Sequence, residues 1–184
     1  MKNVTRLFTV LFINTIICVG QDIKPAPADK AVVYFVRTAS VGMAINFSYY
    51  DSARLIGKFK APKYIRYECK PGVHLFWARS ENRDFVEADL EAGKIYFIEA
   101  IPKMGAMKAR VQLLPLNPND QKKMDKAIKL LTKKSSESFT PEELEIETKN
   151  SPEAISSGLE KYKEDKAKGT INLKLEKSMY YVIQ

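Results

Sequence analysis

Apolar and polar residues alternate with a period of two along much of the chain between residues 30 and 116. Val33 and Phe35 alternate with Val32, Tyr34 and Val36, so this run is apolar on both faces, as is typical of a central strand. Further alternating runs lie at 43–50, 64–69, 73–79, 85–90, 95–101 and 109–113, with turn signals such as Pro71-Gly72 between them. This pattern predicts a mainly β fold: an antiparallel β-sandwich of the immunoglobulin or transthyretin-like kind over residues 30–116.

The period changes to that of a helix after Asn117-Pro118. One amphipathic helix is predicted over about 119–134, and a second begins at Pro141 after a capping box. A third begins at Pro152 and ends at Gly169, and residues 170–175 alternate again as a last strand. We therefore expect residues 117–184 to form a charged helical extension, and the sequence leaves open whether it packs on the sandwich.

The first 20 residues have the pattern of a signal peptide. Lys2 and Arg6 precede an apolar run over residues 7–17, which is shorter than the roughly 20 residues that a membrane-spanning helix needs. Small residues then precede Gln21, where cleavage is predicted, and residues 21–29 form an extended linker. The prediction is an exported protein, located in the periplasm, in the cell envelope or outside the cell.

Cys18 offers an alternative, cleavage before the cysteine and lipid anchoring. The bulky Ile17 disfavours it, because the processing enzyme requires a small residue there. The mature chain holds no second apolar span, so no transmembrane segment is expected. Cys69 is its one remaining thiol, which excludes an internal disulfide and leaves stability to an ordinary core.

Five motifs support a family resemblance. They are Lys30–Arg37, Leu55–Lys58, Lys63–Ile65, Pro71–His74 and Ala92–Phe97. Together they resemble the domain-of-unknown-function family numbered 2846, over about residues 29–114. The resemblance implies an exported β-sandwich of the bacterial envelope, and it carries over no catalytic residue. Many members look like lipoproteins, and Ile17 departs from that pattern.

His74 and Cys69 are the candidate catalytic residues. His74 is the single histidine in the chain, and the two could face each other across the Pro71-Gly72 turn. A buried thiol with a structural histidine is the simpler interpretation. Glu87, Asp89 and Glu91 share one face of a strand and could bind calcium, although a solvated sheet face explains them more simply. No phosphate-binding glycine loop or zinc-ligand spacing is present in the sequence, so no cofactor is predicted.

The densest basic stretch is interleaved with aromatic residues. It contains Arg54, Lys58, Lys60, Lys63, Arg66 and Lys70. Removing residues 1–20 leaves 30 − 2 = 28 basic and 22 acidic side chains, a formal charge of +6. Export argues against nucleic acid as the partner, and peripheral binding of an anionic membrane or glycan is the better alternative. The leading hypothesis is a non-catalytic envelope module that binds a protein or a surface component.

Overall fold

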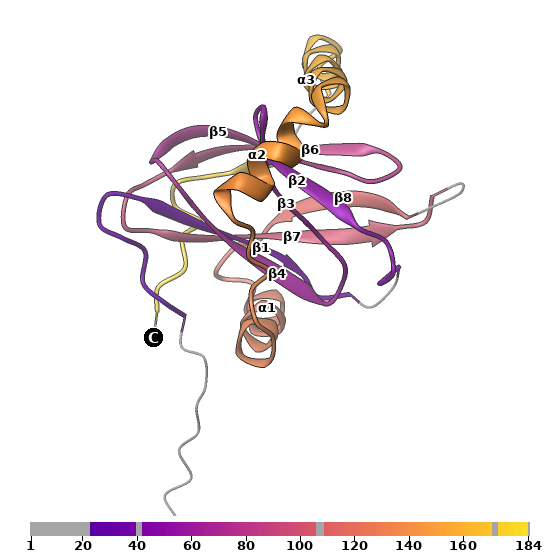
Figure 1. Ribbon diagram of the computed structural model, residues 1–184. Coiled ribbons are helices and arrows are strands. Elements are labelled where there is room, and N and C mark those ends of the chain that lie inside the picture. Colours follow the sequence, from indigo (N-terminus) through magenta and orange to yellow (C-terminus); the bar gives the residue numbers. More distant parts are fainter. Residues whose placement is uncertain (1–22, 40–41, 106–108, 171–172, 184) are drawn as a thin grey trace, which may run out of the picture.

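Two β-sheets pack face to face in the computed structural model, which describes residues 23–39, 42–105, 109–170 and 173–183 (Figure 1). The first sheet has the order β4 (Lys63–Cys69), β1 (Ala31–Arg37), β7 (Ile95–Lys103) and β8 (Arg110–Pro115). The second sheet has the order β3 (Arg54–Phe59), β2 (Phe47–Asp51), β5 (Gly72–Arg79), β6 (Arg83–Leu90) and β9 (Leu173–Leu175). The predicted mainly β fold followed by helices is confirmed.

The sheets are mixed rather than purely antiparallel. β1 pairs with β7 in parallel, and β9 pairs with β6 in parallel. Both pairs join strands that are distant in sequence, so no hairpin fixes their relative direction. Period-two alternation reports which residues face the core and carries no information on direction, which is why the sequence pattern missed these two pairs.

The β2–β3 hairpin also differs from the predicted pattern. The strand predicted over 43–50 begins only at Phe47, because the amide of Ile45 closes a turn onto the carbonyl of Gly42. β3 was not predicted as a strand. The register shifts between Tyr49 and Tyr50 opposite β3, so its neighbouring residues Leu55 and Ile56 are both buried and the alternation is lost.

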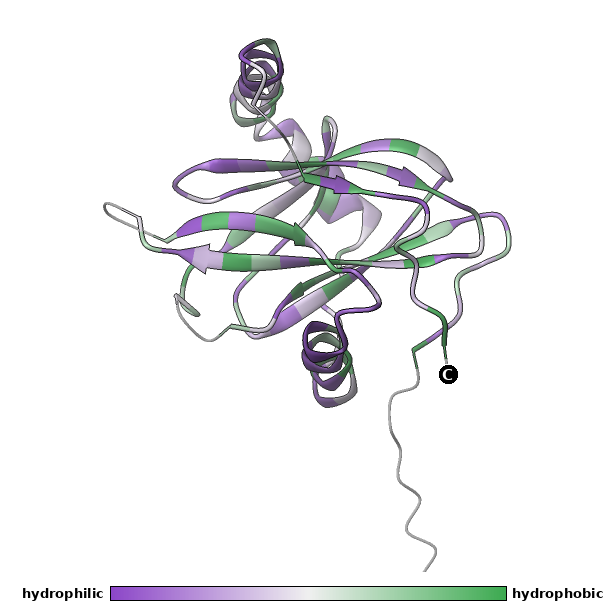
Figure 2. Cartoon of the chain, turned by 180° about the vertical axis from the view of Figure 1, so that it is seen from behind, coloured by the Kyte–Doolittle hydropathy of each residue, from purple (hydrophilic) through white to green (hydrophobic). Residues whose placement is uncertain are grey.

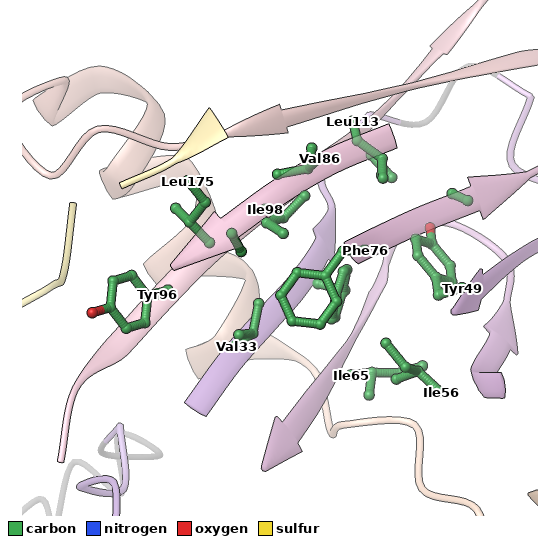
Figure 3. Packing of buried hydrophobic residues seen from close by; sticks show 14 of the residues in the cluster. Val33, Tyr49, Ile56, Ile65, Phe76, Val86, Tyr96, Ile98, Leu113 and Leu175 are labelled. Atoms are coloured by element: carbon green, nitrogen blue, oxygen red, sulfur yellow. The ribbon is translucent and has the colours of Figure 1, made fainter. Parts of the chain in front are cut away.

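The central core lies between the two sheets. Every second residue of β1 contributes to it, and the ring of Phe35 meets that of Phe76 edge to face at 5.3 Å. Leu175 of β9 is 1 % exposed and belongs to the same core, together with Val33 and Phe76 (Figure 3). Burial of each such side chain contributes about 1.5–3 kcal/mol. The carboxyl-terminal segment is therefore part of the sandwich core.

Helices cover the outer faces of both sheets, on opposite sides of the sandwich (Figure 1). α1 (Gln121–Lys133) packs Met124 and Leu131 against the first sheet, in a cluster with Tyr34 and Phe97. α3 (Pro152–Ala167) lies over the second sheet, and α2 (Pro141–Lys149) buries no residue completely. The outward surfaces of these helices are mainly polar (Figure 2). The extension thus packs on the sandwich, and all three helices match their predicted positions.

A glycine lets α3 approach its sheet closely. A Cβ atom added at Gly158 would lie 2.5 Å from Cη2 of Trp77, closer than such atoms come in proteins. Glycine inside a helix costs about 1 kcal/mol relative to alanine. Here that cost is offset because the Trp77 ring packs directly against the helix backbone.

Neighbouring segments occupy backbone groups at both edges of the first sheet, β8 and β4. The side-chain amide of Asn82 donates to the Val111 carbonyl at 2.9 Å and accepts from the Val111 amide at 2.7 Å, and Asp84 accepts from the Leu113 amide at 2.6 Å. At the other edge, the amide of Glu137 donates to the carbonyl of Tyr64 at 2.8 Å. Edge strands with occupied backbone groups resist pairing with other chains. Within the described ranges, no helix combines the length and apolar character needed to cross a bilayer.

Candidate functional site

The strongest polar cluster surrounds His74, where β2, β4 and β5 meet at one end of the sandwich. Nδ1 of His74 lies 2.8 Å from Oδ2 of Asp51, and Nε2 lies 2.8 Å from the carbonyl oxygen of Lys70. The imidazole stacks on the ring of Phe76, with 5.3 Å between centroids and 7° between planes. The side chains of His74 and Asp51 are 14 % and 12 % exposed, so the pair is mostly shielded from water.

Both ring nitrogens of His74 face oxygen atoms that can only accept. A carboxylate and a backbone carbonyl each require an N–H group, so satisfying both makes the ring an imidazolium. The hydrogen bond to Asp51 raises the pKa of His74 to about 10, Cys69 and the Lys70 carbonyl add to the rise, and burial opposes it. His74 therefore carries a positive charge at neutral pH.

Tyr67 joins the cluster from the first sheet. Its hydroxyl donates to Oδ2 of Asp51 at 3.0 Å, so this one carboxylate accepts from both Tyr67 and His74. Burial, followed by the negative charge of Asp51, raises the pKa of Tyr67, which keeps the hydroxyl protonated as a donor. Because Tyr67 is in β4 and the other two residues are in β2 and β5, the cluster links the two sheets.

Cys69 lies beside this cluster, as expected from its position across the turn. It is 7 % exposed, packs in the central core, and directs Sγ at the carbonyl of Ala31 from 3.9 Å. A thiol enzyme needs a base nitrogen free to take the thiol proton. Since both nitrogens of His74 already donate to Asp51 and Lys70, this arrangement lacks a free base and an accessible nucleophile.

Sequence reasoning found His74 and Cys69 and missed Asp51 and Tyr67. Asp51 lies 23 residues before its histidine partner, at the end of a strand whose pattern predicted only a half-buried face. The residue that follows it, Ser52, has a φ of 51°, which marks a tight turn. An acidic residue just before a turn is common, so the sequence held no specific signal for this pair.

The basic stretch is divided between two edge strands of different sheets. Arg54 and Lys58 belong to β3, Lys63 and Arg66 to β4, and Lys60 and Lys70 lie just outside these strands. All are exposed except Arg66, which is half-buried.

Acidic residues of the extension lie against this stretch. Lys63 forms an ion pair with Glu137, and Lys58 shares the lining of a surface pocket with Glu143 and Glu147 of α2. Arg66 pairs with Glu68. The structure therefore offsets part of the positive charge internally, and binding of an anionic surface through these residues stays a prediction.

Two of the three carboxylates considered for calcium, those of Glu87 and Asp89, bind other partners. Glu87 accepts from the hydroxyl of Tyr162 at 2.5 Å and from Nζ of Lys166 at 2.9 Å, and Asp89 lies 3.3 Å from Nζ of Lys177. In the part of the chain that the structure describes, no group of three or more His, Cys, Asp and Glu side chains is arranged to hold a metal ion. Glu87 instead ties α3 to the second sheet.

Comparison of the chain with protein-family models, with curated proteins and with solved structures finds no match. The resemblance to the family numbered 2846 therefore stays a prediction.

Proposed function

We propose that this chain is an exported, non-catalytic module of the cell envelope that binds a protein or a surface component. The observation that carries the non-catalytic part is the state of His74, whose two nitrogens both donate to oxygen acceptors. With Cys69 buried beside it, the one combination of residues considered for catalysis acts as a structural clamp.

The export part of the proposal is supported by the amino-terminal pattern of residues 1–20. The sandwich holds together through an apolar core and through polar links such as Asp51–Tyr67, without a disulfide. Both outer sheet faces carry helices with polar outward surfaces (Figure 2). Such a body presents polar surfaces and pockets to a partner rather than a buried reaction site.

Two measurements test this proposal. Expression of the full chain followed by mass spectrometry should give a mature protein that begins at Gln21, whereas an uncut chain in the cell interior would contradict export. Alkylation of Cys69 by iodoacetamide should be at least about 100-fold slower in the native protein than in urea, because the thiolate must be exposed to react. Native alkylation as fast as in urea would reopen the enzyme alternative.

A further inference from the structure

Two arginines meet on the outer face of the second sheet, beside a surface pocket of about 570 Å³. Arg79 ends β5 and Arg83 begins β6, and the two are directly paired across the hairpin. The start of α3 lines the opposite side of the pocket, through Ser151 and Ser157 among others. The fold thus places two guanidinium groups and a helix start around one hollow.

The residues that line the pocket include two arginines and one carboxylate, that of Glu153, so the lining carries a net positive charge. Like charges at directly opposite strand positions repel each other. Glu153 also lines the pocket, yet no ion pair links it to Arg79 or Arg83 in the described structure. Two adjacent cations beside an open pocket are an arrangement that an anion stabilises.

Unused donors on these arginines strengthen this view. Nη2 of Arg83 donates to Oγ of Ser157 at 2.6 Å, which holds the guanidinium beside the pocket. Arg79 is exposed and lines the same pocket. Each guanidinium has five N–H donors, so the pair can offer several more to a ligand.

The start of α3 adds partial positive charge to the same pocket. Its N-cap residue Ser151 makes no side-chain capping bond, whereas Asp120 caps α1 and Thr140 caps α2. The first amides of a helix lack intrahelical partners and carry partial positive charge. An anion between the arginines and this helix start would accept from both sides.

We propose that the pocket between Arg79, Arg83 and the start of α3 binds a phosphate group of an envelope component. A tetrahedral phosphate suits this arrangement, because its oxygens point in several directions and arginine forks bind it through paired hydrogen bonds. The inference rests on the proposed function only for the source of the phosphate. The chemistry of the pocket stands independently of where the protein acts.

The test is a titration of the mature chain with inorganic phosphate, followed by calorimetry and by the fluorescence of Trp77. This single tryptophan lies two residues from Arg79, so it reports on the pocket. Ionic strength is held constant with chloride, because exposed charges are screened by salt. We expect a dissociation constant on the order of 0.1–1 mM for so small an anion. No saturable binding up to about 10 mM would overturn the proposal.

Two single variants separate the pocket from general charge. Arg79→Gln should weaken phosphate binding at least about tenfold, as expected from the loss of charge-assisted hydrogen bonds. Arg79 makes no bond to α3 in the described structure, so this variant should keep the fold. Arg110→Gln removes an exposed arginine from β8, in the other sheet, and should change the affinity less than twofold. An equal loss of phosphate affinity in both variants would contradict a specific site.

Further binding experiments identify the source of the phosphate. Glycerol 3-phosphate should bind in the same Arg79-dependent way, and sedimentation with phosphatidylglycerol vesicles would assign the site to a lipid headgroup. Phosphate binding without vesicle binding would assign it to a soluble or glycan-borne phosphate. Acetate that binds as tightly as phosphate would overturn the choice of phosphate. A chain that retains Arg79-dependent binding but is not exported would refute the proposed function and leave the pocket intact.

Discussion

Replacing Asp51 with asparagine tests whether His74 is held as an imidazolium by its carboxylate partner. The Asp51→Asn change keeps the shape of the side chain and removes its negative charge. Nδ1 of His74 then faces a neutral amide, while its Nε2 still meets the carbonyl of Lys70. The charged ring loses the partner that stabilised it, so the folded state should be destabilised wherever His74 is protonated.

The size of the effect follows from the pKa of His74. It rises from 6.5 to about 10 on folding, and each pKa unit corresponds to about 1.4 kcal/mol, so linkage sets an upper bound of about 5 kcal/mol. Removing one member of a buried ion pair commonly costs about 3–5 kcal/mol. Because some solvent reaches both side chains and the Lys70 contact remains, we expect Asp51→Asn to lower the free energy of unfolding by about 2–4 kcal/mol at pH 6.

The pH dependence has a definite sign. The folded-state pKa of His74 is raised above its unfolded value, so the stabilisation is fully present below about pH 6.5. It is lost as the pH rises through about 10, where the folded protein also releases the proton. The difference between the wild-type chain and Asp51→Asn should therefore shrink between pH 7 and pH 10.

Urea denaturation followed by the fluorescence of Trp77 measures this difference, because Trp77 is fully buried. Comparing the unfolding free energies of the two proteins at pH 6, 8 and 10 cancels the contributions of groups that titrate alike in both. Asp29→Asn, at an exposed turn, is the matched control and should change stability by less than about 0.5 kcal/mol. A loss of unfolding free energy in Asp51→Asn that stays constant from pH 6 to pH 10 would refute the assignment of His74 as an imidazolium. A His74 pKa below 7 by NMR titration would refute it as well.

Three further changes test the packing, the edge protection and the thiol. Gly158→Ala should destabilise the fold by about 1–3 kcal/mol in urea denaturation, because the new methyl group collides with the ring of Trp77. Asn82→Ala should lower the free energy of unfolding by about 1–3 kcal/mol, since it leaves both backbone groups of Val111 without their partner. Because Val111 lies in an edge strand, the variant should also aggregate more, as measured by light scattering. Cys69→Ala should keep the native circular dichroism spectrum and lower stability by about 1–2 kcal/mol, because the thiol serves as a small buried apolar group.

The predictions for Gly158→Ala and Asn82→Ala each have a matched control. Ser156→Ala changes an exposed residue of α3 and should leave the free energy of unfolding within about 0.5 kcal/mol of wild type. If Gly158→Ala changes stability as little as this control, the predicted collision with Trp77 is contradicted. Asn119→Ala alters an asparagine in an exposed turn and should not increase light scattering. If Asn82→Ala also fails to increase it, edge protection by that side chain is refuted.

The sequence predicted the elements because their periodicity follows directly from burial. β1 is apolar on both faces, since the central core lies on one side and α1 on the other, and the pattern of 32–36 shows this. The same reasoning could not predict β3, because a bulge beside Tyr50 breaks the alternation. The relative direction of paired strands could not be predicted either, because the parallel pairing of β1 with β7 depends on a crossover and not on any local signal.

The candidate site was only half predictable for a related reason. Cys69 and His74 lie five residues apart on either side of a turn, so a local argument could place them together. Asp51 and Tyr67 reach the cluster from two other strands, and Arg79 meets the start of α3 only through tertiary packing. Side chains that come together by long-range contacts leave no spacing in the sequence, and only the fold reveals them.

The helical extension completes the sandwich. α1 covers Tyr34 and Phe97, α3 covers Trp77, and Leu175 fills the central core, so these positions would lose their cover without residues 117–184. Large exposed apolar faces promote association. The pocket that contains Arg79 also exists only where the extension meets the hairpin. Packing and the proposed binding therefore depend on the same contact between the extension and the second sheet.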